Sequence, residues 1–338
     1  MNYTLVVKGS VTVIGGANMD INGFSRDPLN ALDSNPGRVE YCPGGVGRNI
    51  AENLLRLGAE VRFIGVIGDD PGGDFIKNSS AQMGLNIEHS LFLNRKTPSA
   101  GSDEVTSVYI ALMDSNGEMK LALADMDIMD QMTKEHLESK AEIIEESAVV
   151  VLDTNLPEHI ICFILDRFGK GRSGTHEGLL FFLDTVSARK APRAASRIGS
   201  FDTLKLGRME ASILSGTEIP EAKISGDPSP IKELLEEAAK VLIRRGVRRV
   251  FITLGKDGVY AACPGKSIFR PVQYAAPLNT SGGGDAYMAG IVYGTLQDWD
   301  EERILSFSLT MARLTIQSKS AVCPEMSLDL VWKENYHE

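Results

Sequence analysis

The chain has 338 residues, which is enough for one large α/β domain with an attached subdomain or for two ordinary domains. Hydrophobic residues make up 43% of it and charged residues 24%, which is the balance of a globular chain rather than a disordered one. The formal net charge of −10 leaves no basic excess to neutralise a phosphate backbone, so we expect no nucleic-acid partner.

The first residues and the cysteines bear on where the protein works. Residues 1–13 lack a charged region followed by an apolar one, and no apolar run reaches about 18 residues, so we expect neither export nor a membrane anchor. No two cysteines form a C-x-x-C pair; they are Cys42, Cys162, Cys263 and Cys323. Free thiols in a reducing compartment are the simplest interpretation, and we predict a cytoplasmic protein.

Short apolar runs alternate with amphipathic stretches along most of the chain. Five runs rich in β-branched or aromatic residues predict buried strands, at residues 11–14, 61–66, 148–152, 179–183 and 249–254. Helical patterns lie between them, of which the clearest are at residues 49–57 and 229–245. This alternation predicts a mostly parallel sheet that is covered by helices on both faces.

Two segments break the alternation. Residues 105–113 and 119–124 flank Asn116-Gly117, a strong signal for a tight hairpin. Residues 22–41 are rich in turn residues and lack a helical period. We predict that both segments belong to a small β subdomain that projects from the main sheet.

Polar groups follow the first predicted strand. Asn18 and Asp20 suit a polyhydroxylated ligand, because a carboxylate accepts hydrogen bonds from vicinal hydroxyls and an amide both donates and accepts. A glycine-rich turn with Gly44 and Gly45 then opens a helix, where Asn49 can cap the helix or bind a sugar. Each residue alone could be an ordinary loop residue, but ligands of open α/β sheets do bind at the carboxyl ends of strands.

The most informative segment is a second glycine turn, Gly282-Gly283-Gly284, followed by Asp285. Three glycines let backbone N–H groups approach an anion closely, and a helix that begins there points its N-terminus at the same anion. Asp285 could then accept a proton from an attacking hydroxyl while the N–H groups stabilise charge on a phosphoryl group. The alternative is a turn in which Asp285 only caps the helix.

With these motifs the chain resembles the ribokinase-like (PfkB) carbohydrate kinases. That family has a Gly-Gly motif near the N-terminus and a G-A-G-D motif near the C-terminus, which match Gly44-Gly45 and Gly282-Gly283-Gly284-Asp285 in the same order. The resemblance covers almost the whole chain and implies a doubly wound, mostly parallel sheet with helices on both faces and a small β-sheet lid. The implied core is residues 1–21, 42–90 and 125–338, and the implied lid is residues 22–41 and 91–124.

The resemblance also implies ATP and Mg²⁺ as cofactors, with a monovalent cation as a further candidate. It places the family's base on Asp285 and its anion hole on the three glycines of the second turn. The residues implied at the nucleotide are Lys205, Thr253, Gly255, Gly258, Gly282 and Gly284. Those implied at the acceptor are Asn18, Asp20, Gly44, Gly45, Asn49 and Tyr109, and Glu210 is implied at the metal.

The chain departs from the family at the metal segment. The family's N-x-x-E appears here as Gly207-Arg208-Met209-Glu210, so that Glu210 is retained and Gly207 stands at the Asn position. A glycine has no side chain to hold a metal-bound water, which predicts weaker Mg²⁺ handling. Asn at position 207 should restore it, unless the backbone there needs a positive φ.

Within the family, residues 17–20, 33–37, 44–54 and 114–119 are similar to segments of pseudouridine kinases. This implies phosphorylation of the 5′-hydroxyl of pseudouridine to give pseudouridine 5′-phosphate and ADP. The alternatives are a kinase for ribose, adenosine or fructose, and a ligand-binding protein of kinase ancestry with little turnover, which Gly207 favours. The expected partners are a small-molecule sugar or nucleoside and a second copy of the chain, in a homodimer through the lid.

Overall fold

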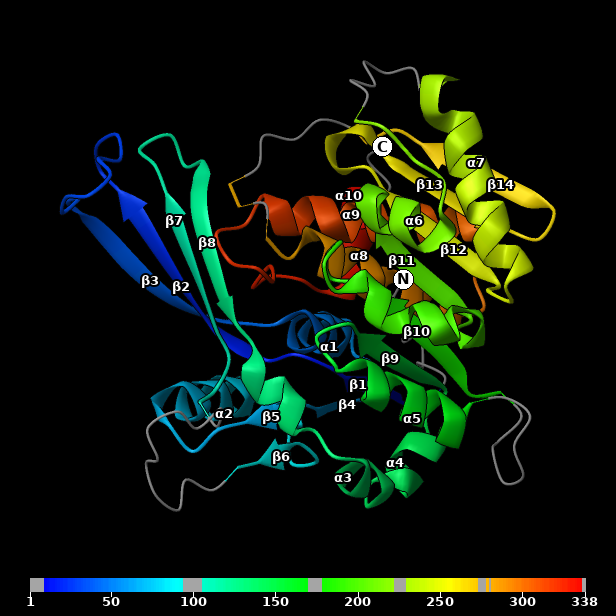
Figure 1. The fold of residues 1–338 in the computed structure, drawn as a ribbon, viewed down its shortest axis with the longest axis horizontal. Coiled ribbons are helices and arrows are strands. Elements are labelled where there is room, and N and C mark those ends of the chain that lie inside the picture. Colours follow the sequence, from blue (N-terminus) through cyan, green and yellow to red (C-terminus); the bar gives the residue numbers. More distant parts are fainter. Residues whose placement is uncertain are drawn as a thin grey trace.

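The computed structural model describes residues 9–93, 105–169, 178–221, 229–272, 278–279 and 281–335. Figure 1 shows a central sheet with helices on both faces and a narrower sheet that projects away from it. None of the helices in these ranges is long and apolar enough to cross a membrane.

The central sheet has eight strands in the order β14-β13-β12-β11-β10-β9-β1-β4. The six strands from β12 to β4 are parallel, and β13 and β14 continue the sheet as an antiparallel hairpin. The bounds are β1 Val11–Ile14, β4 Val61–Ile64, β9 Val149–Asp153, β10 Leu180–Asp184, β11 Thr203–Gly207, β12 Arg249–Thr253, β13 Val259–Cys263 and β14 Lys266–Arg270. The five predicted strands are confirmed, although the run at 61–66 divides into β4 and β5 (Val66–Ile67).

Helices cover the two faces of this sheet in two groups. One group is α1 (Val46–Arg56), α2 (Pro71–Met83), α8 (Gly283–Leu296), α9 (Glu301–Ile316) and α10 (Leu328–Asn335). The other is η1 (Asp127–Gln131), α3 (Lys134–Glu138), α4 (Ala141–Glu145), α5 (Glu158–Phe168), η2 (Ala191–Ser200), α6 (Arg208–Ser215) and α7 (Ser229–Arg244). A short 3₁₀ turn, η3 (Gly255–Asp257), joins β12 to β13.

Successive side chains of the central strands alternate between these two helical layers. Val149 and Val151 of β9 lie in the hydrophobic cluster with α1 and α8, whereas Val150 and Leu152 lie in the cluster with α5 and α6. Both faces of β9 are therefore buried, which explains why its sequence is a continuous apolar run rather than an alternating one.

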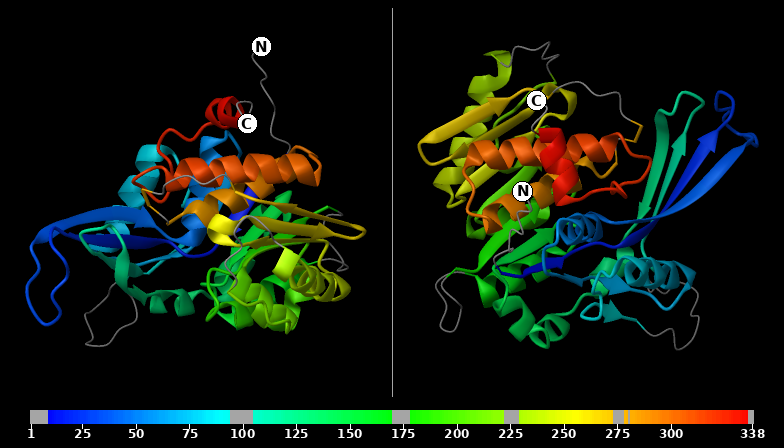
Figure 2. Two further views of the ribbon diagram at one scale, coloured as in Figure 1. Left: turned by 90° about the horizontal axis from the view of Figure 1, so that it is seen from above. Right: turned by 180° about the vertical axis from the view of Figure 1, so that it is seen from behind.

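The projecting sheet has four strands in the order β3-β2-β7-β8. Their bounds are β2 Asn18–Ser25, β3 Gly37–Gly44, β7 Val108–Met113 and β8 Met119–Asp125. The predicted hairpin between β7 and β8 is confirmed, and Gly117 in its turn has a φ of 79°. Figure 2 shows from two further sides that this sheet stands clear of the helical layers, so it has the form of a lid.

The lid strands reach beyond the boundaries implied by the sequence. β2 begins at Asn18 rather than residue 22, and β3 continues to Gly44 rather than residue 41. Leu91–Phe92 (β6) does not join the lid, because it pairs with β5 beside the central sheet. The acceptor motifs at Asn18 and Gly44 thus lie at the base of the lid strands themselves.

The order of the strands also defines where a ligand can bind. The chain leaves β1 for β4 on one side and later adds β9 on the other side of β1. The switch point of the sheet is therefore at the carboxyl ends of β1 and β9, which is where open α/β sheets bind their ligands. The lid strands β2 and β3 follow directly after β1 and so begin at this same edge.

Candidate active site

The second glycine turn forms the N-terminus of α8, as the sequence predicts. Gly282 caps the helix with a φ of 78°, and a Cβ at this position would collide with the carbonyl oxygen of Ala321. Only glycine fits there. Asp285 lies in the first turn of the helix and is 7% exposed, so a carboxyl and the free N–H groups of a helix end share one small volume.

The two glycine-rich turns meet at Asp285. Nδ2 of Asn49, in the first turn of α1, donates a hydrogen bond of 2.9 Å to Oδ2 of Asp285, although the two residues are 236 positions apart. Burial raises the pKa of Asp285 to about 7; the charge of Asp184 adds to this rise, and Lys205 and Asn49 oppose it. A carboxyl with a pKa near neutrality is suited to accepting a proton from a hydroxyl.

An aspartate that the sequence analysis missed, Asp184, supplies a second charge. It is the last residue of β10, is almost fully buried and forms an ion pair of 3.0 Å with Nζ of Lys205 on the neighbouring β11. A Cβ added to Gly284 would lie 2.6 Å from this Nζ, so the lysine adjoins the glycine turn. Burial works to lower the pKa of Lys205, but Asp184 and Asp285 together raise it above its usual value and keep the ammonium charged.

Asp153 is a second residue that the sequence analysis missed, and it connects two elements of the site. It ends β9, and its Oδ2 accepts hydrogen bonds of 2.8 Å from the backbone N–H groups of Gly16 and Gly47. Burial raises the pKa of Asp153 to about 6, and the hydrogen bonds from the N–H groups of Gly16 and Asn155 oppose this rise. The carboxylate thereby ties the end of β1 to the start of α1, beside the switch point.

The predicted acceptor residues lie together at the base of the lid. Asn18 pairs with Gly44 across β2 and β3, and Asp20 of β2 pairs with Tyr109 of β7. Nδ2 of Asn18 donates to Oδ1 of Asp20, and Gly44 leaves the space that the Asp20 carboxylate occupies. Burial raises the pKa of Asp20 to about 6, against the effects of Asn18 and the Arg48 cation.

Gly45 links this group to α1. It has a φ of 100°, and a Cβ at this position would collide with the carbonyl oxygen of Gly16 at the end of β1. The close approach allows the N–H of Arg48 to donate to the same carbonyl at 3.1 Å. A glycine is therefore required for the helix to begin this near to β1.

Asn155 is a third residue that the sequence analysis missed. Its Oδ1 accepts a hydrogen bond of 2.5 Å from Nζ of Lys190. Since a lysine can only donate, this contact fixes the amide so that its NH₂ group faces away from Lys190. A Cβ on Gly16 would lie 2.7 Å from Nδ2 of Asn155, so the NH₂ group points to the carboxyl end of β1.

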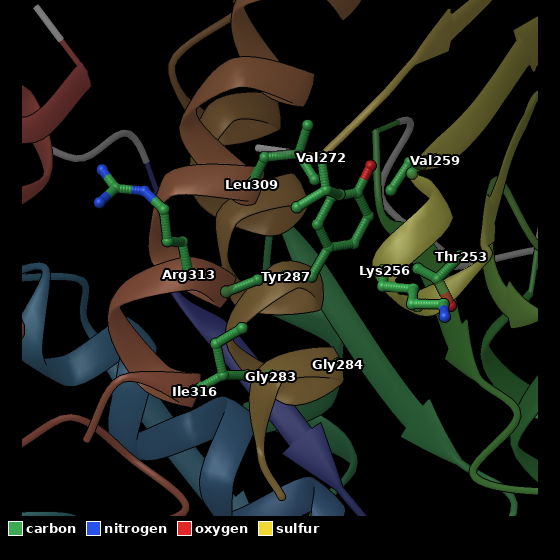
Figure 3. Close-up of a pocket in the computed structure, with 13 residues that line it drawn as sticks. Thr253, Lys256, Val259, Val272, Gly283, Gly284, Tyr287, Leu309, Arg313 and Ile316 are labelled. Carbon is green, nitrogen blue, oxygen red and sulfur yellow. The ribbon is translucent and has the colours of Figure 1, made fainter. Parts of the chain in front are cut away.

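Four of the six predicted nucleotide residues, Thr253, Gly255, Gly258 and Gly284, line a cavity of about 540 Å³, whereas Lys205 and Gly282 are not among its lining residues. Figure 3 shows that side chains of α8 and α9 form one wall and that the segment from β12 to β13 forms the other. The lining residues are Thr253, Gly255, Lys256, Gly258, Val259, Val272, Gly283, Gly284, Tyr287, Leu309, Ala312, Arg313 and Ile316. A mostly apolar cavity of this volume fits a nucleoside, and its floor is the glycine turn.

Glu210 lies beside this cavity, in the first turn of α6. It lines a second cavity of about 420 Å³ that shares Thr253, Gly255 and Lys256 with the first. No group of three or more His, Cys, Asp or Glu in the described ranges could hold a metal by itself. That arrangement still suits Mg²⁺, which keeps several waters and is held by one or two carboxylates together with phosphates.

The structure removes the condition set on an asparagine at position 207. Gly207 has a φ of −79°, which any residue adopts, so its backbone does not require glycine. The carboxylate of Glu210 instead folds over Gly207 and touches the position that a Cβ would take. Because this carboxylate is the end of a flexible side chain, it can move aside.

These features define a small-molecule phosphotransferase with a lid. The model of the pfkB family of carbohydrate kinases matches residues 8–326, and the chain belongs to this family. Pseudouridine kinase of Escherichia coli K12 is 34% identical over 285 residues, which cover 84% of this chain and 83% of that protein. The protein is therefore a carbohydrate or nucleoside kinase with an alcohol group as acceptor.

Solved structures support the same fold. A candidate sugar kinase of Clostridium perfringens has a TM-score of 0.78 with 30% identity, over 97% of this chain and 96% of that one. Ribokinase of Arabidopsis thaliana, solved with ribose and ATP, has a TM-score of 0.77 with 21% identity, over 97% of this chain and 99% of that one. At that lower identity the likeness concerns the fold alone.

Proposed function

We propose that the protein phosphorylates the 5′-hydroxyl of pseudouridine with ATP. The contact between Asn49 and Asp285 carries the proposal, because it joins an acceptor motif at the base of the lid to a carboxyl at an anion-binding helix end. The identity of 34% with a pseudouridine kinase, over 84% of the chain, supports this acceptor over others.

In this proposal Asp285 is the base that takes the proton of the 5′-hydroxyl. Its pKa of about 7 makes it basic enough to accept the proton while about half of the molecules are still ionised at neutral pH. The Asn49 amide holds the carboxylate in place, and the N–H groups of Gly283 and Gly284 stabilise charge on the phosphoryl group. Lys205, beside Gly284, adds a positive charge at the same place.

The acceptor is held at the base of the lid. Asp20 and Asn18 bind ribose hydroxyls, and Gly44 leaves the room that the Asp20 carboxylate needs. Tyr109 lies beside Asp20 on β7 and covers the bound ribose. The oriented NH₂ group of Asn155 is a donor for a carbonyl or hydroxyl oxygen of the acceptor.

The nucleotide fits the cavity of Figure 3. Thr253, Gly255 and Gly258 would line the nucleoside, and the glycine turn would hold the phosphates. Glu210 would hold Mg²⁺ through water, and the bound ion would neutralise charge on the phosphates.

A screen of ATP consumption tests the proposal. The acceptors are pseudouridine, uridine, ribose, adenosine and fructose, each with and without K⁺ in order to test the use of a monovalent cation. We expect the highest kcat/KM with pseudouridine and a 5′-phosphate in the ³¹P NMR spectrum of the product. A higher kcat/KM for another acceptor would overturn the substrate assignment and leave the kinase chemistry standing.

The second candidate is a ligand-binding protein of kinase ancestry, which Gly207 favours because the metal segment has lost a side chain. The raised pKa of Asp285 and the complete glycine turn favour turnover instead. Calorimetric binding of pseudouridine together with no ATP consumption for any acceptor would select this candidate.

A further inference from the structure

Arg48, in the first turn of α1, is a fully buried arginine. Its NH1 forms an ion pair of 3.0 Å with Oε2 of Glu52, one turn further along the helix. Its other contacts are weak: NH1 lies 3.5 Å from the carbonyl oxygen of Pro43, NH2 lies 3.6 Å from Sδ of Met83, and Nε has no hydrogen-bond partner.

Packing alone does not account for an arginine at this position. Removing a guanidinium from water is costly, and apolar residues of similar volume replace buried ion pairs with little loss or even a gain in stability. Here the cost is offset only in part, because one nitrogen is unpaired and two contacts are at the limit of hydrogen bonding. A residue that weakens the fold in this way is expected to serve the site beside it.

Two residues of the acceptor site face Arg48. Its NH1 also lies 3.5 Å from Oδ1 of Asn49, as far as from the Pro43 carbonyl oxygen. Because a guanidinium only donates, its charge favours the orientation in which Oδ1 faces Arg48 and Nδ2 faces Asp285. The second residue is Asp20. Its carboxylate packs against Gly44, and NH1 of Arg48 approaches the carbonyl oxygen of the adjacent Pro43 at 3.5 Å, so the two charges interact across the junction of α1 and the lid strands.

We propose that Arg48 is a positioning residue for the acceptor: its buried guanidinium orients the Asn49 amide toward Asp285 and places a positive charge beside the Asp20 carboxylate. The inference rests on the proposed function, in which Asp20 binds hydroxyls of the acceptor. It explains why a buried cation lies at the base of the lid.

The groups around Asp20 indicate what the loss of this cation would do. Burial raises the pKa of Asp20 to about 6, and the Asn18 hydrogen bond and the Arg48 charge limit that rise. The other ionisable groups that face Asp20 are Cys42 of β3 and Tyr109 of β7, and the pKa of each is raised by burial and by Asp20 itself. Both are therefore neutral near pH 6, and Arg48 is the cation that favours the charged form of Asp20.

Arg48→Met tests the inference, and the structure indicates that the variant will fold. Glu52 keeps a second partner, since NH2 of Arg56 lies 2.7 Å from its Oε1, so no carboxylate is left unpaired. Acceptor affinity is measured by calorimetry without ATP between pH 5 and pH 8.5. We expect the midpoint of its loss at low pH to move up by about one pH unit, since an opposite charge nearby typically shifts a carboxyl pKa by about 1 to 3 units.

Steady-state kinetics give the second readout. At pH 5, below both midpoints, we expect the KM for the acceptor to rise about tenfold, the change that corresponds to one pH unit, and at pH 7 only about twofold, with an unchanged KM for ATP. Arg48→Lys, which keeps the charge, should recover most of the shift in midpoint. Arg56→Met is the matched control, because it removes the other partner of Glu52 and should leave both KM values and the midpoint unchanged.

An unchanged midpoint in Arg48→Met would overturn the inference, and so would an equal rise in both KM values at every pH, because either result describes a purely structural arginine. Should Arg48→Met fail to fold, Arg48→Lys and Glu52→Gln decide the matter by the same two readouts. The result is independent of the acceptor's identity. If the screen selects another sugar, the titration is repeated with that sugar, and only the substrate assignment has failed.

Discussion

Asp285 combines several effects in one side chain. It is buried at a helix end and accepts a hydrogen bond from Asn49. It also lies near one cation, Lys205, and one anion, Asp184. The helix end and Lys205 favour its charged form, whereas burial and Asp184 disfavour it. The balance keeps the carboxyl close to the point at which it can exchange a proton at neutral pH.

Asp285→Asn should therefore remove most of the turnover. The amide keeps the shape and the Asn49 contact on one side but cannot take a proton, and loss of a general base typically costs about 10²- to 10⁴-fold in rate. We expect nucleotide binding by calorimetry to be retained, because the glycine turn is unchanged. A near-normal kcat in this variant would show that another group is the base.

Gly207→Asn should improve the handling of Mg²⁺. The φ of −79° accepts an asparagine, and the atoms nearest to the new Cβ belong to the Glu210 carboxylate, which can rotate away. Groups that hold a metal's ligands in place typically contribute about 10- to 100-fold in affinity or activity, so the Mg²⁺ concentration for half-maximal rate should fall by at least several-fold. Glu210→Gln should raise it. An unchanged Mg²⁺ dependence in a folded Gly207→Asn protein would assign the water to a different residue.

Single residues were predictable where a local pattern marked them. Asp285 follows three glycines, and Asn49 follows a second glycine turn. Asp184 and Asp153 stand at the ends of apolar runs, which is a signal, but their importance depends on β9 and β10 being neighbours whose ends meet α1 and α8. That adjacency is a property of the folded sheet and not of any short stretch of sequence.

At the scale of elements, the strands of the central sheet that could be predicted are apolar runs buried on both faces, whereas the exposed β7–β8 hairpin was predictable from its Asn-Gly turn. β11 was missed because its five residues include Lys205 and end in Gly207, so that its apolar signal is short and interrupted. Its polar lysine is a residue of the site, and sites are where local sequence rules are expected to fail. The lid was predictable as an exception to the alternation, but its strand bounds were not, because β2 runs straight on from the polar segment after β1.

The lid should become less mobile when the site is filled. Asp20 and Tyr109 lie on adjacent lid strands, so an acceptor bound between them links β2 to β7. Hydrogen exchange at residues 108–125 should slow when acceptor and a non-hydrolysable ATP analogue are added together, and less when either is added alone. Protection confined to the central sheet would count against closure of the lid.

At the scale of the whole molecule, the lid presents an apolar face that is exposed in the part of the chain that the structure describes. Leu112 pairs with Leu121 across β7 and β8, and Gly23 pairs with Val39 across β2 and β3, so these residues share one face of the sheet. Asp20 and Tyr109 lie on the opposite face, by the alternation of strand residues. The exposed apolar residues of the uncovered face are Val39 (57%), Tyr41 (59%), Leu112 (38%), Leu121 (64%) and Leu123 (65%).

We propose that this face pairs with its copy in a homodimer, because contiguous exposed apolar patches mark interaction surfaces. The double variant Leu121→Glu and Leu123→Glu should yield a monomer by sedimentation velocity, since it places charges in the centre of the patch. Phe92→Glu, an exposed aromatic residue of β6 outside the lid, is the control and should remain dimeric. A wild-type chain that sediments as a monomer would refute the proposed interface.

The pH dependence of stability follows from the buried aspartates together. Burial raises the pKa of Asp20 and Asp153 to about 6 and that of Asp285 to about 7, all above the ordinary value of 3.8. Between roughly pH 4 and pH 7 the folded chain therefore binds more protons at these sites than the unfolded chain does. Their contribution to stability is present at low pH and is lost as the pH rises through that window.

Asp285→Asn isolates one of these groups. The amide has no charge to bury, so the free energy of unfolding should exceed that of the wild type by about 1 to 3 kcal/mol at pH 8, and by less than half of that difference at pH 5. Urea unfolding at both pH values measures this difference, with Asp74→Asn at an exposed position of α2 as the control. An equal difference at pH 5 and pH 8 would mean that the carboxyl is not held in a raised pKa state. If Asp285→Asn gains stability and also loses turnover, the buried charge of Asp285 lowers the stability of the fold and is retained because the reaction needs it.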